Sequence, residues 1–243
     1  MDKALERDRR VAVLTGGHGG IGRAIAARLE RSGTKVIVFD VAAPQSADAK
    51  RRTYLVDVAD EQAVSECVAA VLADEGRIDI LVNNAGVLGP VVPVAELSLE
   101  HWNWTMRTNL TGTFVCSKLI APFMVKAGWG RIVNISSLQG KEGTELAGAY
   151  AVSKAGQIAL AKVMAKELAR TGVTVNCITP TVVDTGLIDN IDETRKADLL
   201  QRIPMRRFGQ PAEVAEMVAF VVSDACSYTT GATFDVSGGR ATW

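Results

Sequence analysis

Short apolar runs rich in β-branched residues alternate along the chain with longer amphipathic runs. The apolar runs lie at 11–15, 35–40, 53–58, 78–86, 131–136, 173–179 and 232–236, and helical patterns at 21–33, 59–76, 102–128, 149–169 and 211–224. Strands that alternate with helices are typical of a parallel sheet with right-handed crossovers. The pattern therefore predicts an α/β fold, a single domain over residues 1–243 whose doubly wound parallel sheet has helices on both faces.

A glycine-rich segment joins the first predicted strand to the first predicted helix. Between Gly16 and Gly22 the only other residue types are His18 and Ile21. Glycines let the backbone turn tightly and approach a pyrophosphate, and the following helix N-terminus offers free N–H groups to an anion. A segment with this many glycines matches several glycine motifs at once, which makes any single match a weak signal. The order of strand, glycine loop and helix is a stronger signal than the motif for a Rossmann-type, dinucleotide-binding sheet.

An acidic residue ends the second predicted strand. Asp40 lies 18 residues after Gly22, where a carboxylate can accept hydrogen bonds from the adenosine ribose and would repel a 2′-phosphate. The sequence therefore favours NAD over NADP as the cofactor. The basic residues nearby are His18 and the pair Arg51 and Arg52, and we expect each of them to be a solvated loop residue.

Tyr150 and Lys154 lie one helical turn apart, so their side chains share one face of the predicted helix. An ammonium group within roughly 4–6 Å lowers the pKa of a phenol from about 10 by ~1–3 units, which makes the phenol a usable acid and base. Ser137 follows the buried run 131–136, and all three side chains can meet at the carboxyl end of the sheet. The Tyr–Lys spacing alone is a weak signal, because helices often carry a buried Tyr followed by an exposed Lys.

The predicted helix over 102–128 contains residues that an apolar core helix does not need. Asn109 is polar in an otherwise apolar setting, and we interpret it as making an internal hydrogen bond to backbone. Trp102 and Trp104 are predicted to pack in the core or in a subunit contact.

Residues 181–204 interrupt the alternation of strands and helices. The segment is charged, has few β-forming residues and follows the carboxyl end of a predicted strand. This position predicts a substrate lid. An ordinary surface excursion is the alternative.

Charge and cysteine usage narrow the function classes. The chain has 27 basic and 27 acidic residues, so no basic excess suggests binding to nucleic acid or to an anionic membrane. It has no apolar leader and no run of 18 apolar residues, which predicts a soluble, cytoplasmic protein. Its four cysteines lack C-x-x-C spacing, so we expect packed, reduced thiols and no metal site.

Several short motifs occur together in one order. They comprise Thr15, Gly16, Gly20 and Gly22, then Asp57 and Val58, then Asn83, Asn84, Ala85 and Gly86, and finally Asn109, Ser137, Tyr150 and Lys154. In these motifs and their spacing the chain closely resembles the short-chain dehydrogenase/reductase family over nearly its whole length. The resemblance implies a sheet of seven strands, a nicotinamide cofactor, a small-molecule substrate and a homotetramer, with a dimer as the alternative.

The resemblance also implies roles for individual residues. Tyr150 would exchange a proton with the substrate oxygen, Ser137 would hydrogen-bond that oxygen, and Lys154 would lower the pKa of the phenol and bind the nicotinamide ribose. Asn109 would hold a water that links Lys154 to solvent. The implied substrate contacts are Ser137, Gln139, Tyr150 and Thr181. The implied cofactor contacts are Gly16, His18, Gly20, Ile21, Gly22, Asp40, Asp57, Val58, Asn84, Ala85, Gly86, Tyr150, Lys154, Pro180, Val183 and Thr185.

One position departs from the family pattern. The family usually has Pro-Gly after the sixth strand, and this chain has Pro180 and Thr181. Either the loop lies farther from the nicotinamide or Thr181 contacts the substrate, and the sequence leaves both possibilities open.

The substrate is predicted from polar residues around the expected site. They are Gln139, Lys141, Glu142, Thr144 and Glu145 before Tyr150, and Asp184, Asp189 and Asp192 in the predicted lid. A polar pocket suits a polyol, a sugar or a sugar acid, although these charges can equally face water. The alternatives are a 3-oxoacyl-thioester reductase, a nucleotide-sensing scaffold protein on the same fold, and a sugar-nucleotide epimerase, which would normally need a larger C-terminal substrate domain.

Overall fold

A parallel sheet of seven strands forms the centre of the computed structural model, which describes residues 9–44, 48, 50–186 and 192–241. The strand order is β3-β2-β1-β4-β5-β6-β7. The strands are β1 (Val11–Thr15), β2 (Lys35–Asp40), β3 (Arg52–Leu55), β4 (Ile80–Asn83), β5 (Gly130–Ile135), β6 (Val173–Pro180) and β7 (Thr233–Val236). The order reverses between β1 and β4, so a crevice opens where their carboxyl ends diverge. The predicted Rossmann-type α/β fold is confirmed.

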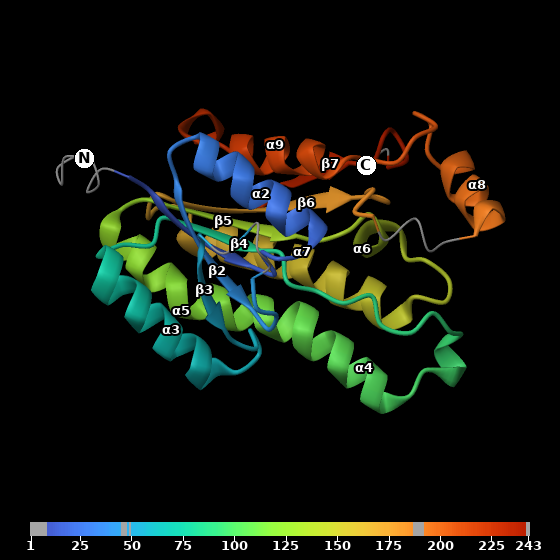
Figure 1. Cartoon of the computed structure of the whole chain (residues 1–243), viewed down its shortest axis with the longest axis horizontal. Helices are drawn as coiled ribbons and strands as arrows, with labels where there is room; N and C mark the ends of the chain where they lie inside the picture. Colours follow the sequence, from blue (N-terminus) through green and yellow to red (C-terminus); the bar gives the residue numbers. More distant parts are fainter. Residues whose placement is uncertain (1–8, 45–47, 49, 187–191, 242–243) are drawn as a thin grey trace.

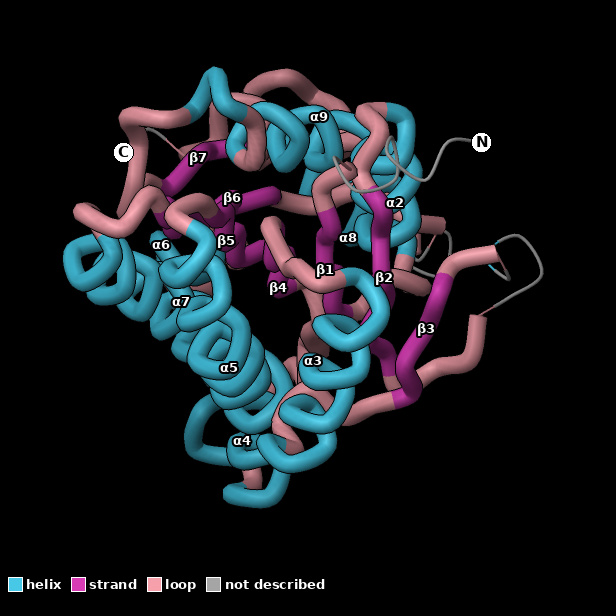
Figure 2. Tube along the Cα trace, turned by 90° about the vertical axis from the view of Figure 1, so that its left-hand side faces the viewer, coloured by secondary structure: helices cyan, strands magenta, loops and turns pink. Residues whose placement is uncertain are grey.

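Helices cover both faces of the sheet. Figures 1 and 2 show α2 (Gly20–Arg31) and α9 (Pro211–Val221) on one face, and α3 (Glu61–Glu75), α5 (Gly112–Ala127) and α7 (Gly148–Leu168) on the other. Successive β1 residues point to opposite faces, so Val13 joins the core under α3 and α5 while Leu14 joins the core under α2. Burial on both sides explains why the strands read as continuous apolar runs.

The predicted helix over 102–128 is interrupted. It consists of α4 (Leu99–Met106), a π-helical turn (Arg107–Thr111) and α5. The run Leu99–Ala127 is long and apolar enough by composition to cross a membrane, and 44% of its most apolar window is buried inside the protein. Val115, Ile120 and Met124 pack in the core beneath the sheet, which is the behaviour of a core helix.

The segment after β6, which interrupts the alternation of strands and helices in the sequence, contains some regular structure. Val183 forms a parallel bridge with Gly209, and α8 (Glu193–Gln201) lies at the carboxyl-terminal edge of the sheet, as does α6 (Gln139–Glu142) (Figure 1). The carboxylate of Asp192 caps α8 by accepting from the backbone of Arg195 at 2.9 Å. Asp189, like Trp243, lies outside the described residues. The function of this segment as a lid stays a prediction.

The C-terminal tail after β7 contacts both α6 and the segment that follows α8. The backbone N–H of Met205 donates to Gly238 O at 3.1 Å, and the guanidinium group of Arg240 lies 3.0 Å from the carboxylate of Glu142. The tail therefore fixes two segments that border the carboxyl ends of the strands.

Candidate active site

A cleft of about 670 Å³ lies at the carboxyl ends of the strands. Most of the residues predicted from sequence line it. They are Gly16, Gly20, Ile21, Gly22, Asp40, Asp57, Val58, Asn84, Ala85, Gly86, Ser137, Tyr150, Lys154, Pro180, Thr181, Val183 and Thr185. The structure does not bring His18, Asn109 and Gln139 onto this wall. The side chains of His18 and Asn109 are turned into internal contacts.

The glycine loop leaves a shallow cradle beside the N-terminus of α2. Gly16 has φ +64°, and a Cβ atom there would lie 2.8 Å from Ala85 Cα; one on Gly22 would lie 2.2 Å from Gly16 O. Asn84 closes the back of the loop, since its side-chain amide donates to Gly16 O at 2.8 Å. Backbone rather than side chains therefore faces the cleft, which is the cradle that a dinucleotide pyrophosphate requires.

Asp40 is held in place by backbone groups. One carboxylate oxygen accepts from the N–H of His18 and the other from the N–H of Ala42, each at 3.0 Å. The carboxylate still lines the cleft. It is therefore oriented for a further hydrogen bond from a ribose hydroxyl.

Two basic residues near Asp40 do not match the expectation of solvated side chains. His18 is 7% exposed, and its Nε2 lies 3.2 Å from Thr53 Oγ1. Arg51 is partly buried and binds the carboxylate of Glu30 with two hydrogen bonds of 2.8 and 2.9 Å. Arg52 is exposed as expected, but it begins strand β3 rather than lying in a loop, and it pairs with Asp74 on α3. The partners named here, Thr53 for His18 and Glu30 for Arg51, are distant in sequence, so local patterns do not reveal these pairings.

Asp57 forms an ion pair on the wall of the cleft. Its carboxylate accepts from Arg107 of the π-helical turn and from the N–H of Ala59 at 2.9 Å. Partial burial opposes ionisation, but these two donors prevail and lower the pKa of the Asp57 carboxyl group. Sequence analysis missed Arg107, which also lines the cleft.

Ser137, Tyr150 and Lys154 converge where β5 ends. The backbone N–H of Gln139 donates to Ser137 Oγ at 3.1 Å, which fixes this hydroxyl. Lys154 Nζ donates to Ile135 O at 2.8 Å and lies 5.6 Å from the centroid of the Tyr150 ring. The three predicted side chains therefore share one wall of the cleft.

The pKa values of Tyr150 and Lys154 shift in opposite directions, each toward its neutral form. Burial raises the pKa of the Tyr150 phenol, and the hydrogen bond with Ser137 offsets part of the rise. Burial lowers the pKa of Lys154 to about 8. The expectation that Lys154 lowers the pKa of Tyr150 is not met here, because the ammonium group is bound to Ile135 O and burial dominates the phenol.

Asn109 makes the internal hydrogen bonds to backbone that its sequence setting indicated. Its side-chain amide donates to Val87 O at 2.9 Å, and its side-chain oxygen accepts from Val87 N at 2.8 Å. Its amide also donates to Ser153 Oγ, whose hydroxyl binds Tyr150 O at 2.7 Å. Gln157, which sequence analysis missed, donates to Asn109 O at 2.8 Å. The water-holding role of Asn109 stays a prediction.

The substrate end of the cleft combines polar and apolar side chains. Thr181 lines it, while its backbone N–H binds Val236 O at 3.2 Å, so the loop stays beside β7. This favours contact with substrate over a displaced loop. Of the polar residues predicted around the substrate, Gln139, Lys141, Glu142, Thr144, Glu145, Asp184 and Asp192 do not line the cleft, and Glu142 pairs with Arg240. The prediction of a polar pocket from these residues is therefore not supported. Trp104 lines the cleft, and 47% of its surface is exposed. It therefore does not lie in the core, which was one of the two positions predicted for it.

A buried phenol, a lysine and a serine on the wall of a dinucleotide-sized cleft define the site of a nicotinamide-dependent oxidoreductase. The chain belongs to the short-chain dehydrogenase/reductase family: a family model described as enoyl-(acyl carrier protein) reductase matches residues 16–241.

Individual relatives cover nearly the whole chain. A 2-dehydro-3-deoxy-L-rhamnonate dehydrogenase (NAD(+)) from Sphingomonas sp. (strain SKA58) is 39% identical over 239 residues, 96% of each chain. The 3-oxoacyl-[acyl-carrier-protein] reductase FabG of Thermotoga maritima is 35% identical over 244 residues, 97% of this chain and 99% of its own. The crystal structure of NAD+-bound xylitol dehydrogenase superposes with a TM-score of 0.89 at 31% identity, covering 95% of this chain and 98% of that chain.

Proposed function

We propose that this protein is an NAD-dependent dehydrogenase that interconverts a secondary alcohol and a ketone on a polyol, a sugar or a sugar acid. The observation that carries the choice of NAD is the Asp40 carboxylate on the cleft wall, oriented by His18 and Ala42. The Sphingomonas relative and the xylitol dehydrogenase, both named with NAD+ and with polar substrates, support the same choice.

The residues present fit a dinucleotide. The backbone of Gly16, Ile21 and Gly22 would hold the pyrophosphate, and Asp40 the adenosine ribose. Bound NAD supplies the hydride acceptor and donor, which the side chains of this chain do not.

Proton transfer falls to Tyr150. In the oxidation direction its phenolate form takes the hydroxyl proton of the alcohol and becomes the phenol, and in reduction the phenol donates its proton to the carbonyl oxygen and becomes the phenolate. Ser137, held by the N–H of Gln139, donates a hydrogen bond to that oxygen and orients it. Lys154, charged below about pH 8, donates to Ile135 O beside Tyr150 and would hydrogen-bond the nicotinamide ribose.

A 3-oxoacyl-thioester reductase is the second candidate. The Thermotoga relative carries such a name, and the apolar side chains of Val87, Leu88 and Trp104 on the cleft wall suit an acyl chain. A spectrophotometric panel of polyols, aldonates and acetoacetyl thioesters, each with NAD(H) and NADP(H), separates the two. Turnover of the thioester with NADPH alone would overturn the NAD-dependent polyol assignment.

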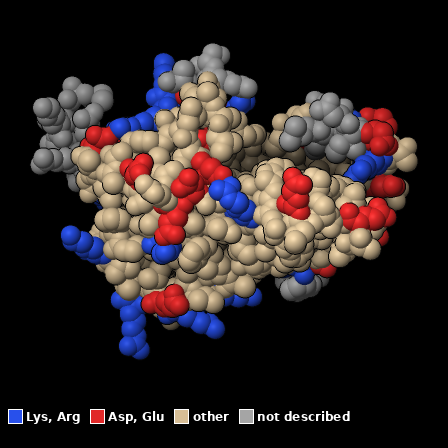
Figure 3. Space-filling view, turned by 90° about the horizontal axis from the view of Figure 1, so that it is seen from below, with Lys and Arg blue, Asp and Glu red and all other residues tan. Residues whose placement is uncertain are grey.

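We also propose a homotetramer, with a dimer as the alternative. Apolar side chains stand exposed on α5 and α7, among them Phe114, Phe123, Val152 and Val163, with exposures of 46%, 42%, 45% and 53%. Figure 3, the view from below, shows acidic and basic side chains scattered among uncharged ones on the side where Figure 1 has α3, α4 and α5. Burial of such side chains between copies would remove apolar surface from water. Light scattering on purified protein tests the assembly.

A cytoplasmic location remains part of the proposal. The four cysteines are free thiols, and three of them are buried, which suits a reducing compartment. Fractionation of the source cells tests it.

A further inference from the structure

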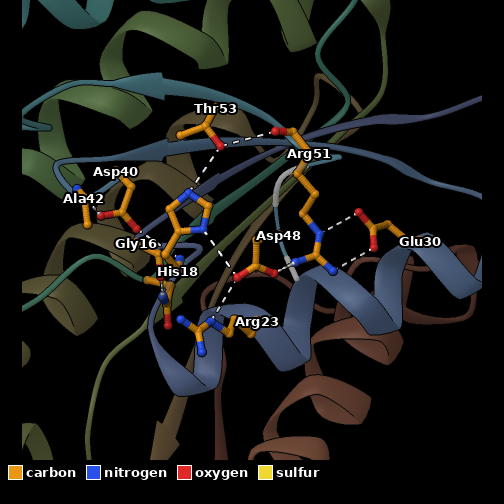
Figure 4. Close-up of polar contacts among 10 residues, drawn as sticks. Gly16, His18, Arg23, Glu30, Asp40, Ala42, Asp48, Arg51 and Thr53 are labelled. Atoms are coloured by element: carbon orange, nitrogen blue, oxygen red, sulfur yellow. Dashed lines mark hydrogen bonds and ion pairs between the residues drawn. The ribbon is translucent and has the colours of Figure 1, made fainter. Parts of the chain in front are cut away.

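A cluster of charged side chains lies behind the adenosine end of the cleft. Its centre is Asp48, a residue of the β2–β3 connection that is only 4% exposed. Figure 4 shows its carboxylate between Arg51, Arg23 and His18. Arg51 pairs with one carboxylate oxygen, Arg23 lies 3.0 Å from the other, and His18 Nδ1 lies 3.8 Å from that same oxygen. A carboxylate buried this deeply is retained only where partners compensate the cost of its desolvation.

Each arginine of the cluster is engaged by at least one carboxylate. Arg51 also binds Glu30 of α2 through two parallel hydrogen bonds, and Arg23, likewise on α2, binds Asp48. The fork of a guanidinium group matches a carboxylate in this way as well as it matches a phosphate. Asp48 thus occupies guanidinium groups that would otherwise suit a phosphate.

His18 connects this cluster to Asp40. Its backbone N–H donates to Asp40, while its imidazole ring is directed the other way, between Asp48 and Thr53. Figure 4 shows the two carboxylates on either side of this one residue. Displacement of the ring would therefore also move the N–H that orients Asp40.

The charge balance of this region depends on Asp48. With Asp40, Asp48 and Glu30 opposite Arg23 and Arg51, carboxylates outnumber guanidinium groups, and a 2′-phosphate on the adenosine ribose would enter a repulsive field. Without the Asp48 charge, two carboxylates would face two guanidinium groups, and a doubly charged phosphate would gain from both arginines.

We propose that Asp48 is a second specificity-determining residue for the adenosine ribose, acting as a positioning residue behind Asp40. It engages Arg23 and Arg51 and fixes His18, so that a 2′-phosphate would meet the carboxylate of Asp40 while both guanidinium groups are already paired. The inference rests on the proposed preference for NAD and assigns part of that preference to a residue that does not line the cleft.

The test uses the adenosine halves of NAD and NADP, which are 5′-AMP and 2′,5′-ADP and differ only by the 2′-phosphate on the ribose. Affinities of the full-length protein for 5′-AMP and for 2′,5′-ADP are measured by calorimetry at fixed ionic strength, so neither the nicotinamide nor the substrate contributes. In Asp48→Asn we expect the affinity for 2′,5′-ADP relative to 5′-AMP to rise about tenfold, as expected when one unit charge is lost near a doubly charged group in a partly solvated site.

A matched control is Glu216→Gln. Glu216 binds Arg28, which also belongs to α2, at 2.7 Å, so the change removes the same charge from an arginine of the same helix, in a more exposed ion pair on the side of α2 that faces α9. We expect its affinity ratio to stay within about twofold of wild type, because Glu216 and Arg28 pair with each other and not with His18, the residue whose N–H orients Asp40. A rise equal to that of Asp48→Asn would reduce the effect to net charge and overturn the proposal.

The outcomes separate this inference from the proposed function. If the wild-type protein itself prefers 2′,5′-ADP, the assignment of NAD fails. If the wild type prefers 5′-AMP and Asp48→Asn leaves the ratio unchanged, only the role of Asp48 fails. Should Asp48→Asn not fold, Arg23→Gln at the partly exposed end of the cluster gives the opposite test, a fall in relative affinity for 2′,5′-ADP of about threefold or more. An unchanged ratio there would also refute the role.

Discussion

The ammonium group of Lys154 donates to the carbonyl oxygen of Ile135, the last residue of β5, at 2.8 Å. The lysine is 4% exposed, so the strand end holds a cation that burial destabilises. The neighbouring Tyr150 phenol is shifted toward its neutral form by the same burial. Two titratable groups whose pKa values are both shifted by burial therefore lie side by side, which is a common arrangement in active sites.

The first prediction concerns the pH dependence of stability. Burial lowers the Lys154 pKa from 10.5 to about 8, so between these values the unfolded chain binds more protons than the folded one. Stability should therefore increase as the pH rises through 8, and the penalty is complete below that pH. Denaturant unfolding should show the wild type gaining about 1 kcal/mol relative to Lys154→Met between pH 7.5 and 9.

The comparison with the variant is necessary because other buried groups oppose this trend. Burial raises the pKa of Cys116 and Cys177 to about 12, which lowers stability at high pH in both proteins. Identical pH profiles for wild type and Lys154→Met would show that Lys154 keeps its ordinary pKa in the folded protein.

The second prediction concerns the proton-transfer group. Tyr150→Phe removes the phenol and keeps the ring, so turnover should fall by about 10²- to 10⁴-fold, the usual contribution of general acid–base catalysis. Binding of NADH, followed by fluorescence, should change little. A variant that keeps near wild-type turnover contradicts the mechanism, whereas lost NADH binding would show that the ring was misplaced.

The third prediction concerns Asn109. Asn109→Ala leaves both the N–H and the carbonyl of Val87 without their side-chain partner. We expect a loss of about 2–4 kcal/mol in unfolding free energy, because each unsatisfied buried group costs about 1–3 kcal/mol.

Asn103→Ala is the matched control for Asn109→Ala. Asn103 is an exposed residue of α4, and its replacement should change the unfolding free energy by no more than about 0.5 kcal/mol. Equal effects of the two substitutions, measured by thermal and denaturant melts, would contradict a special role for the Val87 contacts.

The fourth prediction compares two glycines of the loop. A Cβ atom on Gly22 would lie 2.2 Å from Gly16 O, whereas one on Gly19 would come no closer than 3.6 Å to the same oxygen. Gly22→Ala should therefore displace the loop and weaken NADH binding by at least about tenfold. Gly19→Ala should leave the melting temperature of the unliganded protein nearly unchanged. Similar melting temperatures for both variants would mean that the loop tolerates the clash.

Local patterns were sufficient for much of the molecule. The apolar runs around β1 and β2, the glycine loop and Asp40 follow directly from strand periodicity and glycine chemistry, and the structure has them in that order. Tyr150 and Lys154 reach the cleft for the same reason, because one helical turn places them on one face.

Contacts between distant segments were not accessible from these patterns. The π-helical turn at Arg107–Thr111 changes the helical register, and its Arg107 thereby reaches Asp57. His18 and Arg51 gain carboxylate partners from the β2–β3 connection and from α2. Each outcome depends on which side chains tertiary packing brings together, and no periodicity within a single element encodes it.

The pairing of Arg240 with Glu142, together with the bond from Met205 to Gly238, has a consequence for how the cleft is held together. The glycine loop and Asp40 take no part in these contacts, whereas α6 and the segment after α8 are both tied to the tail. Loss of the tail contacts would therefore loosen the side of the cleft near Ser137 and leave the glycine-loop side in place.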